Sequence, residues 1–155
     1  MSRFSTWKTV TVGMYRSTDE LAKAFKIAAV SMDNGYAPEL IRRIRLSNHI
    51  RQIEVLRVRV GEFFGTEETV TLASLYDKAG NLGCAPLLAE AGLQIAMAYP
   101  EQPRGETLLI GMDPVTLKGH KLIFALQRLS RGQCLTIDSD RTFAFDELFL
   151  FQNGR

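Results

Sequence analysis

Cysteine and histidine are scarce in this chain, and their scarcity argues against several classes of protein. The 155 residues include two cysteines and two histidines. Cys84 and Cys134 lie far apart in the sequence, so they provide neither the paired spacing of a zinc site nor a disulfide framework. His49 and His120 are also distant, and no further ligands at workable spacing accompany them. The sequence predicts no metal centre and two reduced thiols.

The chain also lacks a long apolar run and a strong excess of charge. The first ten residues, MSRFSTWKTV, contain no apolar stretch of signal-peptide length. No uncharged apolar run is long enough to cross a bilayer. The formal net charge is +2, which by itself is too small to argue for binding to nucleic acid or to a membrane. We therefore expect a cytoplasmic protein without a membrane partner.

Apolar residues are plentiful: they make up 46% of the sequence, against 23% charged residues. This balance is typical of a globular protein, because burying that much apolar surface offsets the entropy lost on folding. The length is close to the commonest size of one domain, and no linker, repeat or low-complexity tract divides the chain. We expect a single domain over residues 1–155.

The first half of the chain predicts three helices and two strands. Threonine and valine alternate in the first strand, and Ser17 and Glu20 have the spacing of a capping box at the first helix. Pro38 suits the first turn of the second helix, and Thr71 can cap the third. The predicted strands are TWKTVTVGM (6–14) and IEVLRVRV (53–60). The first predicted helix begins at Ser17 and is ended by the DNG run (33–35), and the other two span residues 37–46 and 71–83.

The second half is interpreted as β-structure, in short apolar runs separated by turn residues. The predicted strands are LQIAMAY (93–99), ETLLIGMDPV (106–115), HKLIFALQRL (120–129), QCLTID (133–138) and TFAFDELFLF (142–151). The expected fold class is α+β, with N-terminal helices packed on a mostly antiparallel β-sheet formed largely by the C-terminal half. The predicted core contains Leu56, Val58, Val60, Leu72, Leu75, Tyr76, Ile95, Ile110 and Phe124.

One polar stretch, YPEQPRGETLLIGMDP (99–114), is interpreted as a hairpin. Residues 93–99 and 106–112 are expected to pair as antiparallel strands, with EQPRG (101–105) exposed at the turn. Prolines cannot donate to a central ladder, so they belong in the loop. Because polar loop tips contribute little to a core, we expect this tip to bind a partner. The predicted partner-binding residues are Gln102, Pro103, Gly105 and Glu106.

The same stretch resembles a family of small uncharacterised bacterial proteins with an Asp-Gln-Pro-x-Gly-Glu hairpin and a strand ending in Met-x-Pro-Ile. The matching positions are Gln102, Pro103, Gly105, Glu106, Met112, Asp113, Pro114 and Val115, and WKTVTVG and STDELAKAF look like that family's opening. The family has proline directly after cysteine, whereas this chain reads Cys84-Ala85-Pro86. The resemblance implies an α+β fold and a surface hairpin, with no substrate, cofactor or reaction.

Our leading functional hypothesis is a small non-catalytic binding or accessory protein that contacts another protein or a second copy of itself. The aromatic C-terminal strand is expected to pack in the core; if it lies at a sheet edge, it can pair with a partner. Its aromatic residues are Phe143, Phe145, Phe149 and Phe151.

The alternative hypothesis is a nucleic-acid-binding module that uses the basic segment 42–59. Within IRRIRLSNHIRQIEVLRVRV (41–60), Glu54 is the only acidic residue, and arginine provides forked donors for phosphate. No helix-turn-helix, aromatic RNA-binding or zinc-finger pattern accompanies it. The candidate phosphate-contacting residues are Arg42, Arg43, Arg45, Arg51, Arg57 and Arg59.

A third hypothesis is a small hydrolase whose site the sequence does not identify. Glu101 and Glu106 border the hairpin and can approach each other across the loop, as an acid–base pair must. Either histidine can serve as a base for a cysteine or serine that is close in space. The glycine-containing stretches GTEET and KAGNLG lack the strand–loop–helix pattern of phosphate binding, so no cofactor is predicted.

Overall fold

The computed structural model describes residues 4–33, 35–65 and 69–154. The helices in these residues are α1 (Thr18–Ile27), α2 (Ala37–Arg43), α3 (Gly61–Phe64), α4 (Leu72–Asn81) and α5 (Ala89–Ala98). The strands are β1 (Lys8–Val12), β2 (Ser31–Met32), β3 (Arg51–Arg59), β4 (Val70–Thr71), β5 (Cys84–Ala85), β6 (Thr107–Ile110), β7 (Val115–Leu117), β8 (His120–Leu129), β9 (Gly132–Ser139), β10 (Thr142–Phe143) and β11 (Leu148–Asn153).

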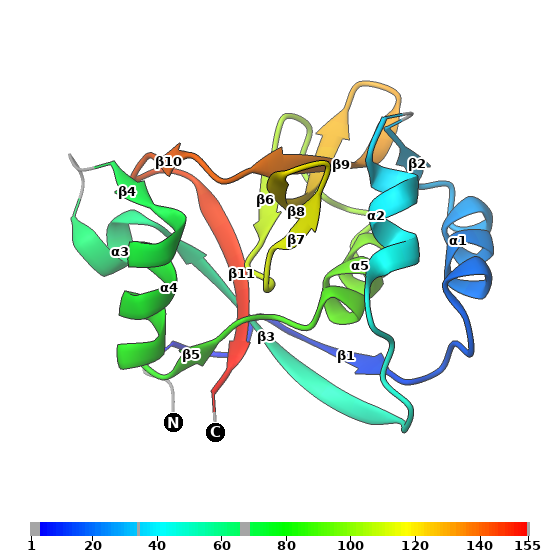
Figure 1. Cartoon of the computed structure of the whole chain (residues 1–155), viewed down its shortest axis with the longest axis horizontal. Coiled ribbons are helices and arrows are strands. Elements are labelled where there is room, and N and C mark those ends of the chain that lie inside the picture. The colour runs from blue at the N-terminus through cyan, green and yellow to red at the C-terminus, as the bar shows by residue number, and fades with distance from the viewer. Residues whose placement is uncertain (1–3, 34, 66–68, 155) are drawn as a thin grey trace.

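A strongly curved mixed sheet organises the molecule (Figure 1). Its strand order is β1-β3-β11-β6-β8-β9-β2, with β5 added beside β11 and β7 beside β8. Most neighbours are antiparallel, but β11 runs parallel to β6, and β2 runs parallel to β9. The α+β class is thus confirmed, whereas the sheet is mixed and includes β1, β2 and β3 from the N-terminal half.

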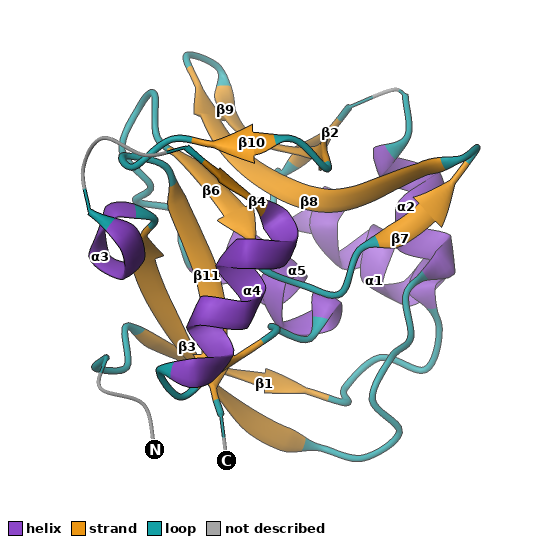
Figure 2. Cartoon of the chain, turned by 60° about the vertical axis from the view of Figure 1, so that its left-hand side comes forward, coloured by secondary structure: helices purple, strands orange, loops and turns teal. Residues whose placement is uncertain are grey.

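The C-terminal strand β11 lies in the middle of this sheet, between β3 and β6. Phe149 is paired with Val58, and Phe151 with Leu56, so these four side chains share one face. Phe63 of α3 and Tyr76 of α4 pack on Phe151 with ring centroids 6.0 Å and 5.6 Å away. Figure 2 shows α4 across this face. The aromatic residues therefore build a core, and the idea that β11 is a free edge for a partner is wrong.

Helix α5 covers the opposite, concave face of the sheet, where it packs on β1 and β8 (Figures 1 and 2). Most of its residues are buried, including Glu90, Leu93 and Ile95. Its approach to β6 is close: a Cβ on Gly92 would lie 2.6 Å from the side chain of Ile110. This helix replaces the strand expected over residues 93–99. A short apolar run does not distinguish a strand from a helix buried on most sides, and here the helix forms.

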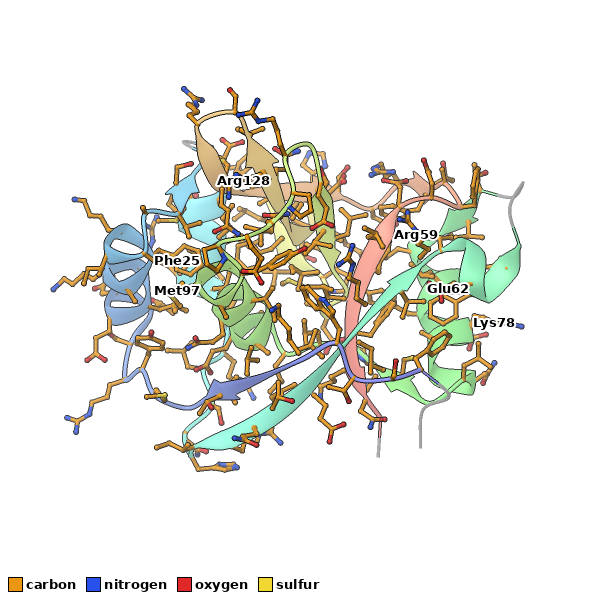
Figure 3. The ribbon with its side chains drawn as sticks, turned by 180° about the vertical axis from the view of Figure 1, so that it is seen from behind. Phe25, Arg59, Glu62, Lys78, Met97 and Arg128 are labelled. Carbon is orange, nitrogen blue, oxygen red and sulfur yellow. The ribbon has the colours of Figure 1, made fainter. Side chains whose placement is uncertain are left out.

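Helices α1, α2 and α4 begin near the predicted positions, whereas α1 ends before the DNG run (33–35) and α3 lies in a segment predicted as a connection. The side chain of Ser17 accepts a hydrogen bond from the amide of Glu20 at α1, and Thr71 does the same for Ser74 at α4. Helix α1 packs against α2, and Phe25 points from α1 into the core (Figure 3). Local capping signals therefore predicted where α1 and α4 begin.

The predicted core residues are buried, except that Tyr76 is only half-buried at the margin. The stretch predicted as one strand over 142–151 divides into β10 and β11, and Phe145 between them is 43% exposed. Among the described residues, no helix combines the length and apolar character needed to cross a membrane.

Replacing Gly111 tests the packing between β6 and β11. A Cβ there would lie 2.6 Å from the ring of Phe151 and 2.7 Å from the carbonyl oxygen of Leu150. We expect Gly111→Ala to lower the free energy of unfolding by about 1–3 kcal/mol, as overpacking does. Gly80 in α4 has open space around its Cβ position, so Gly80→Ala is the matched control and should not destabilise. Urea denaturation measures both, and equal stability of the two variants would contradict this packing.

Candidate functional site

Two loops meet at one end of the β1–β3 ribbon: the loop from β1 to α1 and the loop from α2 to β3 (Figures 1 and 2). We call residues 13–16 and 44–51 the loop face. The buried carboxylate of Glu90 joins the two loops. The Gly13 amide donates to Glu90 Oε2 at 2.9 Å, and the Ser47 amide donates to Oε1 at 2.8 Å. Glu90 is 1% exposed. The two backbone N–H groups therefore replace water as hydrogen-bond donors to its buried carboxylate.

Gly13 allows the two loops to approach this closely. Its φ is +88°, and a Cβ there would lie 2.0 Å from the carbonyl oxygen of His49. Only glycine fits this position, both for its backbone conformation and for the space. The geometry of the loop face is therefore fixed by Gly13 and Glu90 together.

A pocket of about 300 Å³ opens on the loop face. Leu46 and Leu88 are half-buried in its lining, where they also pack against the core. Its cationic lining residues are Arg45 and Arg51, both exposed. In the described part of the chain, neither arginine takes part in an ion pair. The pocket thus combines an apolar floor with a basic rim.

Two large aliphatic side chains on the loop face are exposed to solvent. Met14 follows Gly13 and is 61% exposed, and Ile50 is 68% exposed. Because a Cβ on Gly13 would lie 2.9 Å from Ile50 Cα, the two segments are in contact where these residues stand. The loop face therefore presents apolar residues beside unpaired cations.

The six arginines of the basic segment fall into three groups. Arg42 and Arg43 end α2, where Arg43 pairs with Glu39 at 3.4 Å. Arg45 and Arg51 line the pocket. Arg57 and Arg59 lie near the other end of β3, where Figure 3 labels Arg59. The segment therefore does not form one continuous basic surface, because β3 places Arg57 and Arg59 several residues along the strand from Arg51 at the pocket.

Arg57 belongs to a partly buried cluster with Glu106. Its guanidinium donates to Glu106 Oε2 at 2.8 Å and lies over the Trp7 ring at 5.4 Å. Trp7 meets Tyr99 edge-to-face at 5.0 Å. Burial raises the pKa of the Tyr99 phenol, and the Glu106 carboxylate raises it further. Arg57 therefore has an internal partner in this structure.

The turn that follows α5 is held to the sheet through Gln102, and the expectation of an exposed tip fails at this residue. Gln102 is 2% exposed; its Nε2 donates to the carbonyl of Leu126 at 3.1 Å, and its Oε1 accepts from Gln133 at 3.1 Å. Glu106 is paired with Arg57. Within EQPRG (101–105), Glu101, Pro103, Arg104 and Gly105 are exposed and Gln102 is buried. Gln102 and Glu106 are hydrogen-bonded to buried backbone and to a partly buried charge. A sequence pattern does not distinguish such internal polar residues from polar residues that face solvent.

The groups considered for a hydrolase have other partners among the described residues. Glu101 pairs with Lys8 at 3.5 Å and Glu106 with Arg57, so different cations hold the two carboxylates. His120 is exposed at the start of β8. Ser47 Oγ donates to the backbone carbonyl of His49 at 2.8 Å. Within residues 4–33, 35–65 and 69–154, no three His, Cys, Asp or Glu side chains are placed to hold a metal ion.

Comparison with protein-family models, curated proteins and solved structures gives no match to this chain. The resemblance seen in the sequence therefore rests on its motif residues alone, and the function is inferred from geometry. The sequence did not point to Met14 or Ile50, and it placed Glu90 among the carboxylates that border the hairpin rather than in the interior. For Glu90 a signal was present, because it is the only charged residue in the apolar stretch LLAEAGLQIAMAY.

Glu90 provides a test of how the loop face is held. We expect Glu90→Gln to lower the free energy of unfolding by about 1.5–3 kcal/mol, because the amide keeps one acceptor oxygen but turns a donor toward the other backbone N–H. Amide exchange at Gly13 and Ser47 should accelerate. Glu20→Gln is the control: its carboxylate also accepts a backbone bond, from Arg16, but is exposed, so the loss should stay within about 0.5 kcal/mol. Equal losses in both variants would contradict a clamping role for Glu90.

The turn after α5 is tested by removing its internal bonds. We expect Gln102→Ala to cost about 1–3 kcal/mol, because the carbonyl of Leu126 and the amide of Gln133 lose a buried partner. Arg104→Ala at the exposed tip should change stability by less than about 0.5 kcal/mol. Thermal and urea denaturation compare the two. An unchanged melting temperature for Gln102→Ala would mean that the turn is only a surface tip.

Proposed function

We propose that this protein is a non-catalytic binding domain that acts through contact with another protein, and that the loop face is the contact surface. A location in the cytoplasm belongs to this proposal. It follows from the sequence, in which Cys84 and Cys134 lie far apart and give no disulfide framework.

The observation that carries the proposal is the rigid exposure of Met14 and Ile50. Single exposed apolar residues are common and need no explanation. Here two of them stand on neighbouring loops that Glu90 fixes from inside, beside a pocket with an apolar floor. Such patches are typical of interaction sites. Loops that are already ordered lose little entropy on binding, which favours affinity.

A binding role rather than catalysis is supported by the polar groups of the same surface. Both carboxylate oxygens of Glu90 accept backbone bonds, and Ser47 Oγ is bonded to a backbone carbonyl. The His49 ring nitrogen Nδ1 lies 2.9 Å from Asn48 Oδ1. These side chains order the loops and do not form a nucleophile–base pair.

The experiment places a photo-crosslinking amino acid at Ile50 and, in a second variant, at Ile27. Ile27 is the matched control, since it is 88% exposed and ends α1, away from the loop face. We expect one protein to be crosslinked at position 50 and not at position 27. With that protein purified, Ile50→Ser should weaken binding about tenfold, as loss of an apolar anchor does, while Ile27→Ser leaves it unchanged. Identical crosslinking, or equal affinity of both serine variants, would refute the proposal.

A nucleic-acid-binding module is the second candidate, and the meeting of Arg45 and Arg51 at one pocket without ion pairs favours it. If phosphates bind there, Arg45→Gln should reduce the slope of log affinity against log salt by about one unit. A labelled RNA 20-mer and a DNA duplex of equal length provide the probes in a salt series. No binding to either at low salt eliminates this candidate.

A further inference from the structure

We propose that the partner presents an acidic segment with one large apolar side chain, and that this side chain enters the pocket between Arg45 and Arg51. This inference rests on the proposed function and specifies the chemistry of the partner. It follows from the size and floor of the pocket, from the charge of its rim, and from the residues that surround it.

The pocket has room for one large apolar side chain. Its volume of about 300 Å³ is at the small end of the range for ligand pockets. Leu46 and Leu88 form an apolar floor that continues into the core. An apolar side chain inserted there would be removed from water on several sides, which is how anchor residues contribute most of the binding energy at protein interfaces.

The rim of the pocket selects for acidic neighbours of that anchor. Arg45 and Arg51 form no ion pair in the described residues, so their charge is available to a partner. Glu90 is the one acidic residue in the lining. Its oxygens accept the amides of Gly13 and Ser47 inside the protein and it is 1% exposed, so its charge is balanced locally. The outward-facing potential is therefore positive, and complementary charge guides partner choice.

The surroundings favour a protein over a nucleic acid or a membrane. Met14 and Ile50, the large apolar residues exposed on the loop face, are aliphatic, whereas single-stranded nucleic acids bind on stacked aromatic rings. Within segment 42–59, β3 separates Arg57 and Arg59 from the pocket arginines, which does not give a continuous phosphate track. A membrane-binding basic cluster has about four to eight Lys or Arg residues, and a flat bilayer surface does not fill a small pocket.

The test is a selection from a random peptide library displayed on phage, with the full chain immobilised. We expect the selected peptides to be enriched in Asp and Glu around one Leu, Ile, Phe or Met. A synthetic peptide of the selected sequence should bind the wild-type chain and bind more weakly at high salt, because rim charges are screened. Its version with Lys in place of each acidic residue should not bind.

Two matched double variants locate the binding. Arg45→Gln with Arg51→Gln should weaken binding of the selected peptide about 5- to 30-fold, or about 1–2 kcal/mol for two rim charges. The control, Arg104→Gln with Arg131→Gln, removes the same charge from exposed positions outside the loop face and should leave affinity unchanged. Equal effects of the two variants would show that only net charge matters and would overturn the proposal.

Three other results would also overturn it: no selected peptide, selected peptides without acidic enrichment, or an RNA 20-mer that displaces the peptide and depends on the same two arginines. Failure of this inference is distinguishable from failure of the proposed function. If position 50 still crosslinks to one protein but the contact segment of that protein is not acidic, the binding role stands and the acidic chemistry is wrong. If Ile50→Ser and the arginine variants leave binding of the crosslinked protein unchanged, both are wrong.

Discussion

The Glu90 carboxylate connects the packing of the protein to its surface. It lies on α5, the helix around which the sheet curves, and it holds one loop from each side of the β1–β3 ribbon through backbone amides. A buried carboxylate is tolerated only when donors replace its water. The two loops therefore need Glu90 to be fixed, and Glu90 needs both loops to be balanced. The position of Met14, Ile50 and the pocket follows from this mutual requirement.

The central place of β11 sets the rest of the architecture. Inserted between β3 and β6, it presents Phe151 to α3 and α4, Phe149 to Phe143 of β10, and Leu150 to the opposite face. Both faces of this strand are therefore buried in the hydrophobic core. The ion pair between Arg57 and Glu106 lies near the end of β3 that is remote from the loop face. Because its charges neutralise each other, this end of β3 offers less to a partner than the loop face does.

The proposed function depends on the contrast between these two ends. Arg57 has an internal partner and Arg59 donates to the carbonyl of Asp146, whereas Arg45 and Arg51 border a pocket without ion pairs in the described residues. The exposed residues Met14 and Ile50 lie on the loop face with Arg45 and Arg51. A surface with unsatisfied cations and ordered apolar residues is better suited to binding a partner than to stabilising the fold.

The sequence by itself determined the elements whose signals are local. Ser17 and Thr71 began helices as their side chains predicted, alternation placed β3, and most of the predicted core is buried. Tertiary structure decided the rest. Residues 93–98 lie in α5, which is buried on most sides. Their apolar residues therefore show no helical or strand periodicity from which the element could be predicted. Gln102 and Glu106 are internal because partners 24 or more residues away reach them. Likewise, the separation of the arginines and the pairing of Glu90 with two distant loops arise from contacts between segments remote in sequence, and a local pattern contains no information about such contacts.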